Sequence, residues 1–596
     1  MPRRFRDPHE QVPLRELPAA ALRASLREGY TKADFKADAM AGLVVGIVAL
    51  PLSMALAIAV GAPPQHGLYT AIVGGFLVAL LGGSRVQVTG PTAAFVVILA
   101  PIVVKFGLSG LLLAGFMAGA ILCVMGLLRL GRLIEFIPHP VTTGFTAGIA
   151  LVIAVLQVKD LFGLRPHGSP DHFFEYIWTM WQARGGLSFQ ELGIGLGTLA
   201  VLVFLPRLTN RVPGPVVALP LAALAGAILP QVIAGFHVET IATKFHTQVG
   251  EQLVSGIPRL PPLPSIPWHG VTFGMVQDLL PAAFAIAMLG AIESLLCAVV
   301  ADGMARTKHD PDSELIALGV GNLVTPLFGG IPATGAIART ATSLRFGARS
   351  PVAAMVHSVT VLAAIVGGAK LIGYLPMASL AALLLMVAWN MADLRHFMRI
   401  VRVAPRSDVA VLLVCFGLTV AFDMVIAVGV GVVFAALLFM RRMAALTKTE
   451  IAVGKHPALP RDLPPGVVVY DIDGPLFFGA AEKAMATLGI IGDRAHVVIL
   501  RMESVPFMDA TGLVALESAL EALAQRRCMA VLLGLQRQPR RVLRSAGLGP
   551  KPGWIRIAPD AESAIRAAEE FVKGPLTARR LKKQVMQPPG VDAPSS

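Results

Sequence analysis

Cysteine and charge are scarce in this sequence of 596 residues, and each shortage excludes a class of protein. The four cysteines, Cys123, Cys297, Cys415 and Cys528, stand far apart, so neither a disulfide framework nor a zinc knuckle is expected. Charged residues make up 15% of the chain and hydrophobic residues 55%, a balance that an ordinary soluble core cannot bury. With a mean hydropathy of +0.69, the composition indicates an integral membrane protein.

The sequence patterns of common enzymes and metal sites are also missing. No His-x-x-x-His pair, Gly-x-x-x-x-Gly-Lys loop or Cys-x-x-Cys pair occurs. One stretch, VVVYDIDGP (467–475), resembles the aspartyl nucleophile of haloacid-dehalogenase phosphatases. Pro475 stands where that motif has Thr or Val, however, and no Asp-Asp pair follows. The chain is therefore predicted not to be an enzyme, and no cofactor or metal is expected.

Apolar segments of roughly 17 to 25 residues, the length that crosses hydrocarbon as a helix, recur between residues 38 and 441. Fourteen are predicted when Gly- and Pro-broken ones are included, centred near residues 49, 74, 96, 119, 148, 198, 224, 288, 320, 338, 360, 381, 415 and 432. Residues 1–37 are polar and contain no cleavable signal sequence, so they are expected to form a cytoplasmic N-terminal segment.

The orientation follows from Lys and Arg, which fall mainly in the short connections on the side of the N-terminus. Such residues mark the cytoplasmic side of a membrane. Because an even number of spans returns the chain to its starting side, both termini are predicted to be cytoplasmic. The net charge of +14 is explained by this bias and by contact with the lipid bilayer, so no nucleic acid partner is expected.

Two distant segments resemble each other, which indicates an internal repeat. They are LYTAIVGGFLVALLGGS (68–84) and LIALGVGNLVTPLFGGI (315–331). Three pairs of glycines align: Gly74 with Gly321, Gly82 with Gly329, and Gly83 with Gly330. An odd number of spans separates the two copies, so the second is expected to be inverted in the membrane.

Each copy is followed by a broken, partly polar segment: VQVTGPTAAFVV (86–97) and PATGAIARTATS (332–343). A half-helix that starts after such a break presents unpaired N–H groups and the positive end of its dipole. Two such ends that meet form an anion site. The predicted substrate-binding residues are Thr89, Thr92, Ala93, Thr334, Gly335, Ala336, Ile337, Ala338 and Arg339.

Arg339 brings a full positive charge and a guanidinium fork that suits a carboxylate. Placing arginine within the membrane costs on the order of 3 kcal/mol, so Arg339 is expected to face a wet cavity or a partner. The alternative is that it reaches the cytoplasmic surface beside Arg345.

Glu293 is the other intramembrane charge of note. It is predicted to be the coupling site, either as a proton carrier or as a ligand of a coupling cation. The alternative is a structural ion pair or a hydrogen bond between helices. Asn322 is expected to be a hydrogen bonder in helix packing, and Asp302, Asp393 and Asp423 are expected near the membrane interface.

The motifs GLYTAIVGG, GGSRVQVTGPTAAF, LGAIESLLCAVVADGM and GNLVTPLFGGIPATGAIARTA together resemble the SulP family of anion transporters, in order from about residue 30 to 550. The resemblance implies a polytopic α-helical membrane protein in which 14 transmembrane segments form two inverted 7-helix repeats, divided into core and gate domains. It also implies a homodimer, a substrate site between spans 3 and 10, and an ion-coupling role for the acidic position that Glu293 occupies.

Within that family, further segments are most similar to a bacterial uptake protein for C4-dicarboxylates. The similarity implies proton-coupled uptake of succinate, fumarate or aspartate by alternating access, with H+ favoured over Na+. One departure matters: Ala336 and Ala338 stand where many relatives carry hydroxyl groups. A sodium-coupled bicarbonate or sulfate transporter of the same family, or an anion channel, therefore stays open as an alternative.

Beyond the transmembrane transporter domain (38–441), residues 442–465 have the polar, Pro-rich composition of a linker. Alternating strands and helices then predict a small α/β domain at 466–575, followed by a disordered basic tail at 576–596. PFMDATGL (506–513) resembles the capping loop of a STAS domain, with Asp509 as the helix cap. Ala510 replaces the hydroxyl of phosphorylated STAS domains, so that switch is expected to be lost, and Thr511 is expected to be a first-turn residue. The domain could bind a cytoplasmic protein partner.

Overall fold

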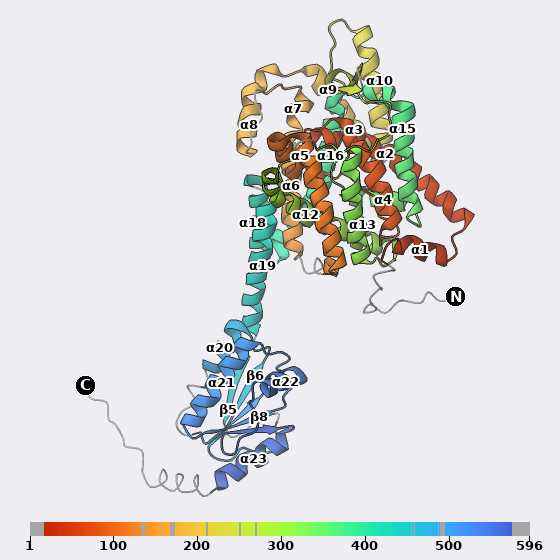
Figure 1. The fold of residues 1–596 in the computed structure, drawn as a ribbon. Helices are drawn as coiled ribbons and strands as arrows, with labels where there is room; N and C mark the ends of the chain where they lie inside the picture. Colours follow the sequence, from red (N-terminus) through yellow and green to blue (C-terminus); the bar gives the residue numbers. More distant parts are fainter. Residues whose placement is uncertain are drawn as a thin grey trace, which may run out of the picture. The chain divides into compact units, whose positions relative to one another are not determined.

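A computed structural model of the chain describes residues 17–132, 138–166, 173–209, 212–249, 252–268, 271–422, 424–446, 448–453, 456–457, 459–486, 488 and 495–574. The chain forms two units, residues 1–435 and 436–596, and helix α19 (Met424–Leu446) crosses the boundary between them. The first unit is almost entirely helical, and the second combines a sheet with helices (Figure 1). The expected basic tail and Asp423 lie outside the described residues.

Every predicted span centre falls within a helix of the described chain. Nine helical segments there are long and apolar enough to cross a membrane, and the predicted third and fourth spans make one of them, α5 (Ala93–Leu127), which bends at Gly107 with a φ of 67°. The remaining predicted spans, centred near residues 320, 338, 415 and 432, fall in other helices of the described chain. The other helices of the N-terminal half are α1 (Ala20–Arg27), α2 (Lys32–Val60), α3 (Pro64–Tyr69), α4 (Gly75–Leu81), α6 (His139–Leu156), α7 (Val158–Phe162), α8 (Phe173–Gln182), α9 (Phe189–Leu208), α10 (Gly214–Val232) and α11 (Ile241–Lys244).

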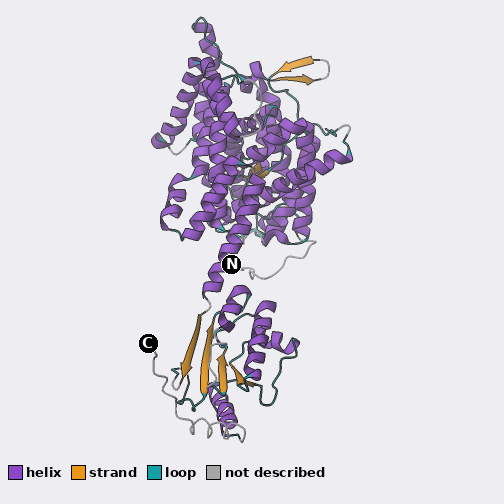
Figure 2. Ribbon diagram, turned by 90° about the vertical axis from the view of Figure 1, so that its left-hand side faces the viewer, coloured by secondary structure: helices purple, strands orange, loops and turns teal. Residues whose placement is uncertain are grey.

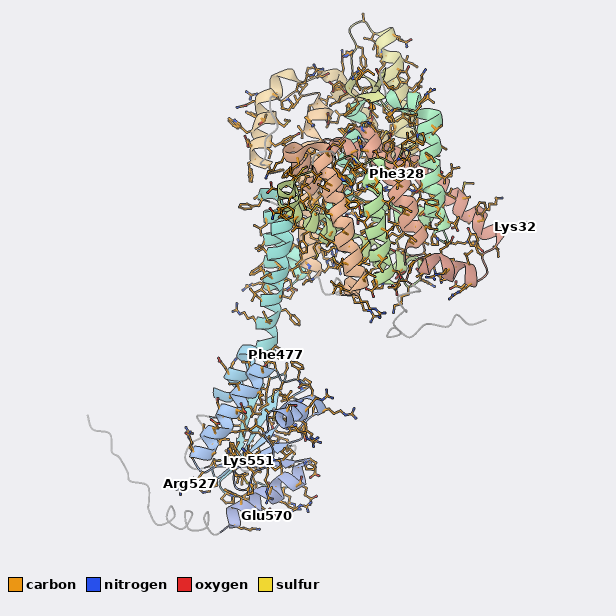
Figure 3. The ribbon with its side chains drawn as sticks, in the orientation of Figure 1. Lys32, Phe328, Phe477, Arg527, Lys551 and Glu570 are labelled. Carbon is orange, nitrogen blue, oxygen red and sulfur yellow. The ribbon has the colours of Figure 1, made fainter. Side chains whose placement is uncertain are left out.

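The second half of the first unit begins with a hairpin, β2 (His246–Val249) and β3 (Gln252–Ser255), and continues as helices. These are α12 (Phe273–Ala305), α13 (Pro311–Val324), α14 (Ile337–Arg345), α15 (Val352–Gly373), α16 (Met377–Ala392), α17 (Leu394–Val403) and α18 (Arg406–Ala421). Helix α2 starts at Lys32, earlier than the sequence indicated, because Thr31 and Asp34 form a capping box. Lys32, labelled in Figure 3, is exposed.

The helices of the first unit pack in two groups. In one group α13 and α12 lie against α5, and α15 lies against α2. In the other, α18 and α16 lie against α6, and α16 and α10 lie against α9. Small residues allow the close packing, since a side chain on Gly119 of α5 would collide with the backbone of α13. We call these groups the core and the gate.

The two copies of the predicted repeat pack against each other in a reciprocal way. Gly82 and Gly83, at the end of the first copy, adjoin the start of α13, at Glu314 and Asp310. Gly329 and Gly330, at the end of the second copy, adjoin α3 at His66 and the π-helix that follows it, η2 (Thr70–Gly74), at Thr70. Midway between them, Gly74 faces Thr325, and Gly321 faces Val78. Each end thus meets the other copy's beginning, as an inverted repeat requires.

The second unit contains a five-stranded sheet of order β5-β6-β7-β8-β9, in which β5 is antiparallel to β6 and the others are parallel. The strands are β5 (Lys448–Val453), β6 (Val467–Asp473), β7 (Val497–Arg501), β8 (Met529–Leu533) and β9 (Ile555–Ala558). The helices are α20 (Phe478–Ala486), α21 (Ala510–Gln525), α22 (Arg537–Ser545) and α23 (Ala561–Lys573). Strands β6 to β8 are almost wholly buried, because apolar layers cover both faces of the sheet.

The predicted strands and helices of this α/β domain agree with β6, β7, β8, α20, α21 and α22. Asp509 caps α21 as expected, since its side chain accepts a hydrogen bond from Gly512 N at 2.7 Å. The segment 442–465 is not wholly a linker, however, because it contributes strand β5 to the sheet. Strand β9 and helix α23 were not foreseen.

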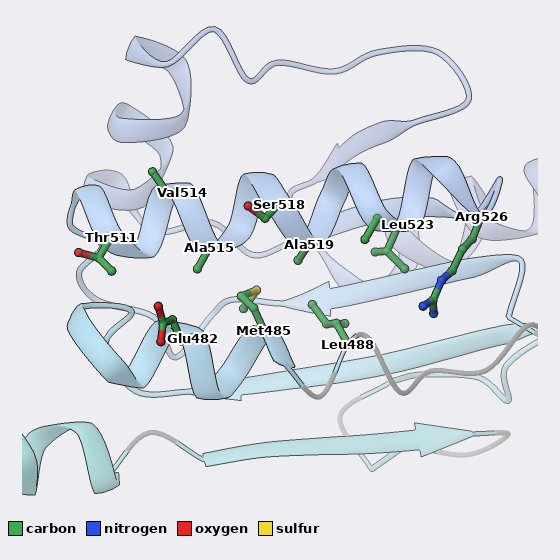
Figure 4. Close-up of a pocket in the computed structure, with 11 residues that line it drawn as sticks. Glu482, Met485, Leu488, Thr511, Val514, Ala515, Ser518, Ala519, Leu523 and Arg526 are labelled. Atoms are coloured by element: carbon green, nitrogen blue, oxygen red, sulfur yellow. The ribbon is translucent and has the colours of Figure 1, made fainter.

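A groove of about 410 Å³ lies between α20 and α21 in this unit. Its floor is apolar and includes Met485, Leu488 and Leu523. Glu482 and Thr511 lie at one end of the groove and Arg526 at the other (Figure 4). Thr511 is in the first turn of α21, as the sequence predicted.

Candidate functional site

Both broken segments form a two-residue strand, and these strands pair with each other. In the antiparallel pair of β1 (Thr89–Gly90) and β4 (Thr334–Gly335), Thr89 is opposite Gly335 and Gly90 is opposite Thr334. Helices of the first unit enclose the pair (Figure 2). The side chains of Thr89 and Thr334 are buried, and the Thr334 hydroxyl donates to Gly290 O of α12 at 3.0 Å. Two segments that lie far apart in the sequence therefore meet inside the core.

A helix starts directly after each strand of this pair. Helix α5 begins at Ala93 after Thr92, and α14 begins at Ile337 after Ala336. Because the strands are antiparallel, the helices leave the pair in opposite directions, with both N-termini directed toward it. Neither Thr92 nor Ala336 provides a side-chain cap. The first-turn N–H groups of both helices thus lack the usual capping acceptor and are suited to an anion.

Arg339 lies in the first turn of α14 and is buried, with 2% of its surface exposed. Its Nη2 donates to Pro91 O, directly before α5, and Gly90 is so close that any side chain there would collide with the guanidinium. Nε and Nη1 are buried and have no partner among the described residues. Arg339 therefore does not reach the surface beside Arg345, which excludes that alternative, and a water or solute that binds these two nitrogens has to enter the core.

Glu293, in the middle of α12, lies beside the start of α5. Its Oε2 accepts a hydrogen bond from the Thr92 hydroxyl at 3.0 Å. The side chain is only partly buried, and no described cationic side chain forms an ion pair with it. The carboxylate can therefore exchange a proton or bind a cation beside one of the two helix ends. The alternative role of Glu293, a hydrogen bond between helices, is also present in the structure, since its bond with Thr92 joins α12 to the start of α5.

The predicted site residues divide into accessible and buried ones. Ile337 is 42% exposed, Ala338 is also exposed, and Thr92 is partly exposed. Ala93, Gly335 and Ala336 are buried. A solute that approaches the pair therefore meets backbone and small side chains at the start of α14, with Glu293 nearby. The binding roles of these residues stay predictions.

A hydrogen-bond network behind the strand pair was not foreseen from the sequence. Gln87 Nε2 donates to Glu314 Oε1 at 2.8 Å and to the Ser294 hydroxyl at 2.7 Å. Glu314 Oε2 accepts from Gly83 N at 3.0 Å and from Ser84 N at 3.1 Å. Glu314 thereby joins the connection before β1 to α13, and Gln87, which approaches Gly335 closely, supports the pair from behind. The sequence feature that could have indicated this network is the presence of Gln87 and Glu314 in otherwise apolar segments.

Asn322 fixes the approach to β4. Its Nδ2 donates to Ala333 O at 2.9 Å and to Leu318 O at 3.0 Å, and its Oδ1 accepts from Ala333 N at 2.7 Å. Asn322 is thus a buried hydrogen bonder as expected, but it joins α13 to the extended segment before β4 and not to another helix. It replaces the helical hydrogen bonds that are lost where the chain leaves helix before the strand.

Replacing Asn322 by leucine should destabilise the protein, because the buried N–H and C=O groups of Ala333 lose their partners. At about 1 to 3 kcal/mol for each of the two unsatisfied groups, we expect the free energy of unfolding to fall by about 2 to 6 kcal/mol. Thermal unfolding of the purified protein in detergent measures this. Asn390→Leu, at an exposed position of α16, is the matched control and should melt like the wild type. Equal melting temperatures for both variants would show that Ala333 finds other partners.

Comparison with known proteins places this geometry within a family. The model of the sulfate permease family matches residues 35–415, and the STAS domain model matches residues 460–564. The chain is 38% identical over 527 residues to the putative sulfate transporter YvdB of Bacillus subtilis, which covers 88% of this chain and 96% of that protein. It is 30% identical over 549 residues to the bicarbonate transporter BicA of Picosynechococcus sp., which covers 88% of this chain and 92% of that protein.

Among solved structures, the murine Solute Carrier 26 family member A9 anion transporter superposes with a TM-score of 0.80 at 19% identity. The match covers 95% of this chain and 96% of that one. This similarity supports the predicted fold class, a helical membrane domain of this type followed by a STAS domain. YvdB and BicA are named for sulfate and bicarbonate, so the similarity to a dicarboxylate transporter stays a prediction.

Proposed function

Since the chain belongs to the sulfate permease family, an anion transporter family, we propose that it is a secondary active carrier for proton-coupled uptake of C4-dicarboxylates. Succinate, fumarate and aspartate are the expected substrates. The observation that supports this proposal is the meeting of two uncapped helix N-termini at the β1–β4 pair, with Arg339 and Glu293 beside it.

A dicarboxylate has two negative groups, and the site offers positive potential from two kinds of source. The N-termini of α5 and α14 each supply about half an elementary charge from the helix dipole. Arg339 supplies a full charge, and its buried Nε and Nη1, which have no partner among the described residues, can each donate a hydrogen bond to an oxygen of the substrate. Because Ala336 and Ala338 carry no hydroxyl groups, backbone N–H groups and Arg339 would carry most of the recognition.

Coupling is assigned to Glu293. A protonated Glu293 makes the loaded core less charged, so the core crosses the hydrophobic boundary with the gate more easily. After the core has crossed, the carboxylate releases its proton to the other side. The division of the helices into core and gate supports such alternating access, since α5 and α12 belong to the core and α14 packs against α12 and α2 of that group.

Sulfate and bicarbonate are the second candidate substrates, with sodium as the coupling ion. The relatives favour them, since YvdB is named as a putative sulfate transporter and BicA as a bicarbonate transporter. A channel would use the same helix ends without needing Glu293. Accumulation against a concentration gradient separates a carrier from a channel.

The substrate can be determined with purified protein in liposomes. We expect labelled succinate to accumulate when the lumen is more alkaline than the outside, and unlabelled fumarate and aspartate to compete for this uptake. Sulfate and bicarbonate are tested as competitors in the same assay, with sodium present and absent. Accumulation of sulfate or bicarbonate that requires sodium, with no uptake of succinate, would replace the dicarboxylate proposal. Equilibration without accumulation would indicate a channel.

The remaining proposals concern the location, oligomeric state and partners of the carrier. The carrier is expected to be a homodimer in the bacterial inner membrane. Both termini are expected to be cytoplasmic, and the excess of Lys and Arg in the connections on that side supports this orientation. The groove between α20 and α21 makes the STAS domain a candidate for binding a cytoplasmic protein.

A further inference from the structure

Helix α17 has a sequence and an environment that differ from those of the membrane spans beside it. It joins α16 to α18, and a left-handed residue, Asp393 (φ 34°), separates it from α16. Asp393 also caps it, accepting a hydrogen bond from His396 N at 3.2 Å. The helix is short, and none of its residues is buried. It therefore lies where the chain leaves one span and enters the next.

One face of α17 holds it to the gate. The ring of Phe397 packs at 5.7 Å from the ring of Phe416 in α18, and His396 lies 5.0 Å from His139 at the start of α6. His396 and Phe397 are consecutive, so their side chains lie about 100° apart around the helix and contact two different neighbours. Two helices of the gate, α6 and α18, thereby fix the position of α17.

The outer face carries three arginines in one line. Arg395, Arg399 and Arg402 have the spacing of four and three residues that places side chains on one side of a helix, and all three are exposed. Within the described part of the chain, none of them takes part in an ion pair. Three adjacent guanidinium groups without a counter-charge repel one another, so a bound anion would stabilise them.

Apolar side chains border this line of arginines. Leu394 is 49% exposed, Met398 is 42% exposed and Val403 is 77% exposed. Together with the arginines, these residues of one helix line an open hollow of about 460 Å³. A free inorganic anion would leave the apolar border in water, whereas a phospholipid matches both parts: its phosphate meets the guanidinium groups and its acyl chains cover the apolar residues.

We propose that α17 is a binding site for an anionic phospholipid, with Arg395, Arg399 and Arg402 as the ligands of the headgroup phosphate. The guanidinium fork binds phosphate through two hydrogen bonds at once. Basic residues next to a membrane span are attracted to the anionic lipids of the leaflet that they face. Because α17 contacts the gate, the lipid holds the gate at the membrane surface.

Native mass spectrometry of the full chain in neutral detergent tests this proposal. The protein is mixed with equal amounts of phosphatidylglycerol and phosphatidylcholine of the same acyl chains, and the lipids that remain bound are counted. The wild type should retain phosphatidylglycerol preferentially. The variant R395Q/R399Q/R402Q should retain at least about tenfold less of it, with retention of phosphatidylcholine unchanged.

A matched control is available on α22, where Arg537, Arg540 and Arg544 are exposed at a similar spacing. The variant R537Q/R540Q/R544Q removes the same charge and should bind lipid like the wild type. An equal loss in both variants would show a general charge effect and overturn the proposal. Displacement of the lipid by millimolar inorganic phosphate would also overturn it, since the site would then select the anion alone. If the α17 variant aggregates, single substitutions replace it, each with at least about a twofold loss.

Discussion

Replacement of Glu293 by glutamine is expected to abolish uptake driven by a pH gradient while anion binding stays close to that of the wild type. Glutamine has nearly the same shape and can still accept the hydrogen bond from Thr92, but it cannot carry a proton. Uptake of succinate by proteoliposomes with an alkaline lumen should therefore fall to the level of empty liposomes. Exchange of external for internal succinate without a gradient should continue.

Asp278 provides the control for this experiment, because it is an exposed carboxylate on the same helix, α12. Asp278→Asn should couple like the wild type. Unchanged gradient-driven uptake in the Glu293 variant would reject the assignment of the coupling site. Loss of both uptake and binding would instead indicate that the negative charge of Glu293 maintains the binding site itself.

Replacing Arg339 by alanine should weaken dicarboxylate binding by at least about tenfold, equal to about 1.4 kcal/mol. This is close to the lower end of what a hydrogen bond to a charged group contributes. Isothermal titration of the purified protein with succinate measures the affinity. Arg339→Lys keeps the charge but loses the fork, so its affinity should lie between those of the wild type and the alanine variant.

The bond from Arg339 to Pro91 O means that the alanine variant could also lose stability, so the melting temperature is measured with the affinity. A lower melting temperature with wild-type affinity would make Arg339 a support of the turn before α5 and place the anion elsewhere. Arg345→Ala serves as the control, since Arg345 is exposed at the end of the same helix, α14. It should change neither property.

The positions of the apolar spans and of both breaks could be predicted because they depend on local sequence. Long apolar runs specify spans, and the segments 86–97 and 332–343, in which Gly and Pro stand among polar residues, interrupt them. The repeated glycines have the same spacing in both copies, and this repeat predicted that the two breaks meet. These local features were sufficient for the fold class.

Features that depend on contacts between distant segments could not be predicted in this way. Glu314 stands near the start of α13, where an acidic residue usually only favours the helix dipole, and nothing local relates it to Gln87. Whether Arg339 points toward Pro91 or toward the surface is also decided by tertiary packing. Strand β5 was missed because it is an edge strand with half-exposed apolar residues, Ile451 at 44% and Val453 at 72%, in a polar segment.

The short strand pair has a mechanical consequence for transport. Backbone hydrogen bonds join β1 to β4, and the side chains of Arg339 and Thr340 reach across to Pro91 and Val88, so α5 and α14 are tied together where their N-termini meet. Because these bonds join the two helix N-termini, the distance between them should stay the same when the core moves relative to the gate. We therefore expect the solute to bind with nearly the same dissociation constant in the inward-open and outward-open states. The direction of net transport is then set by the ion gradient alone.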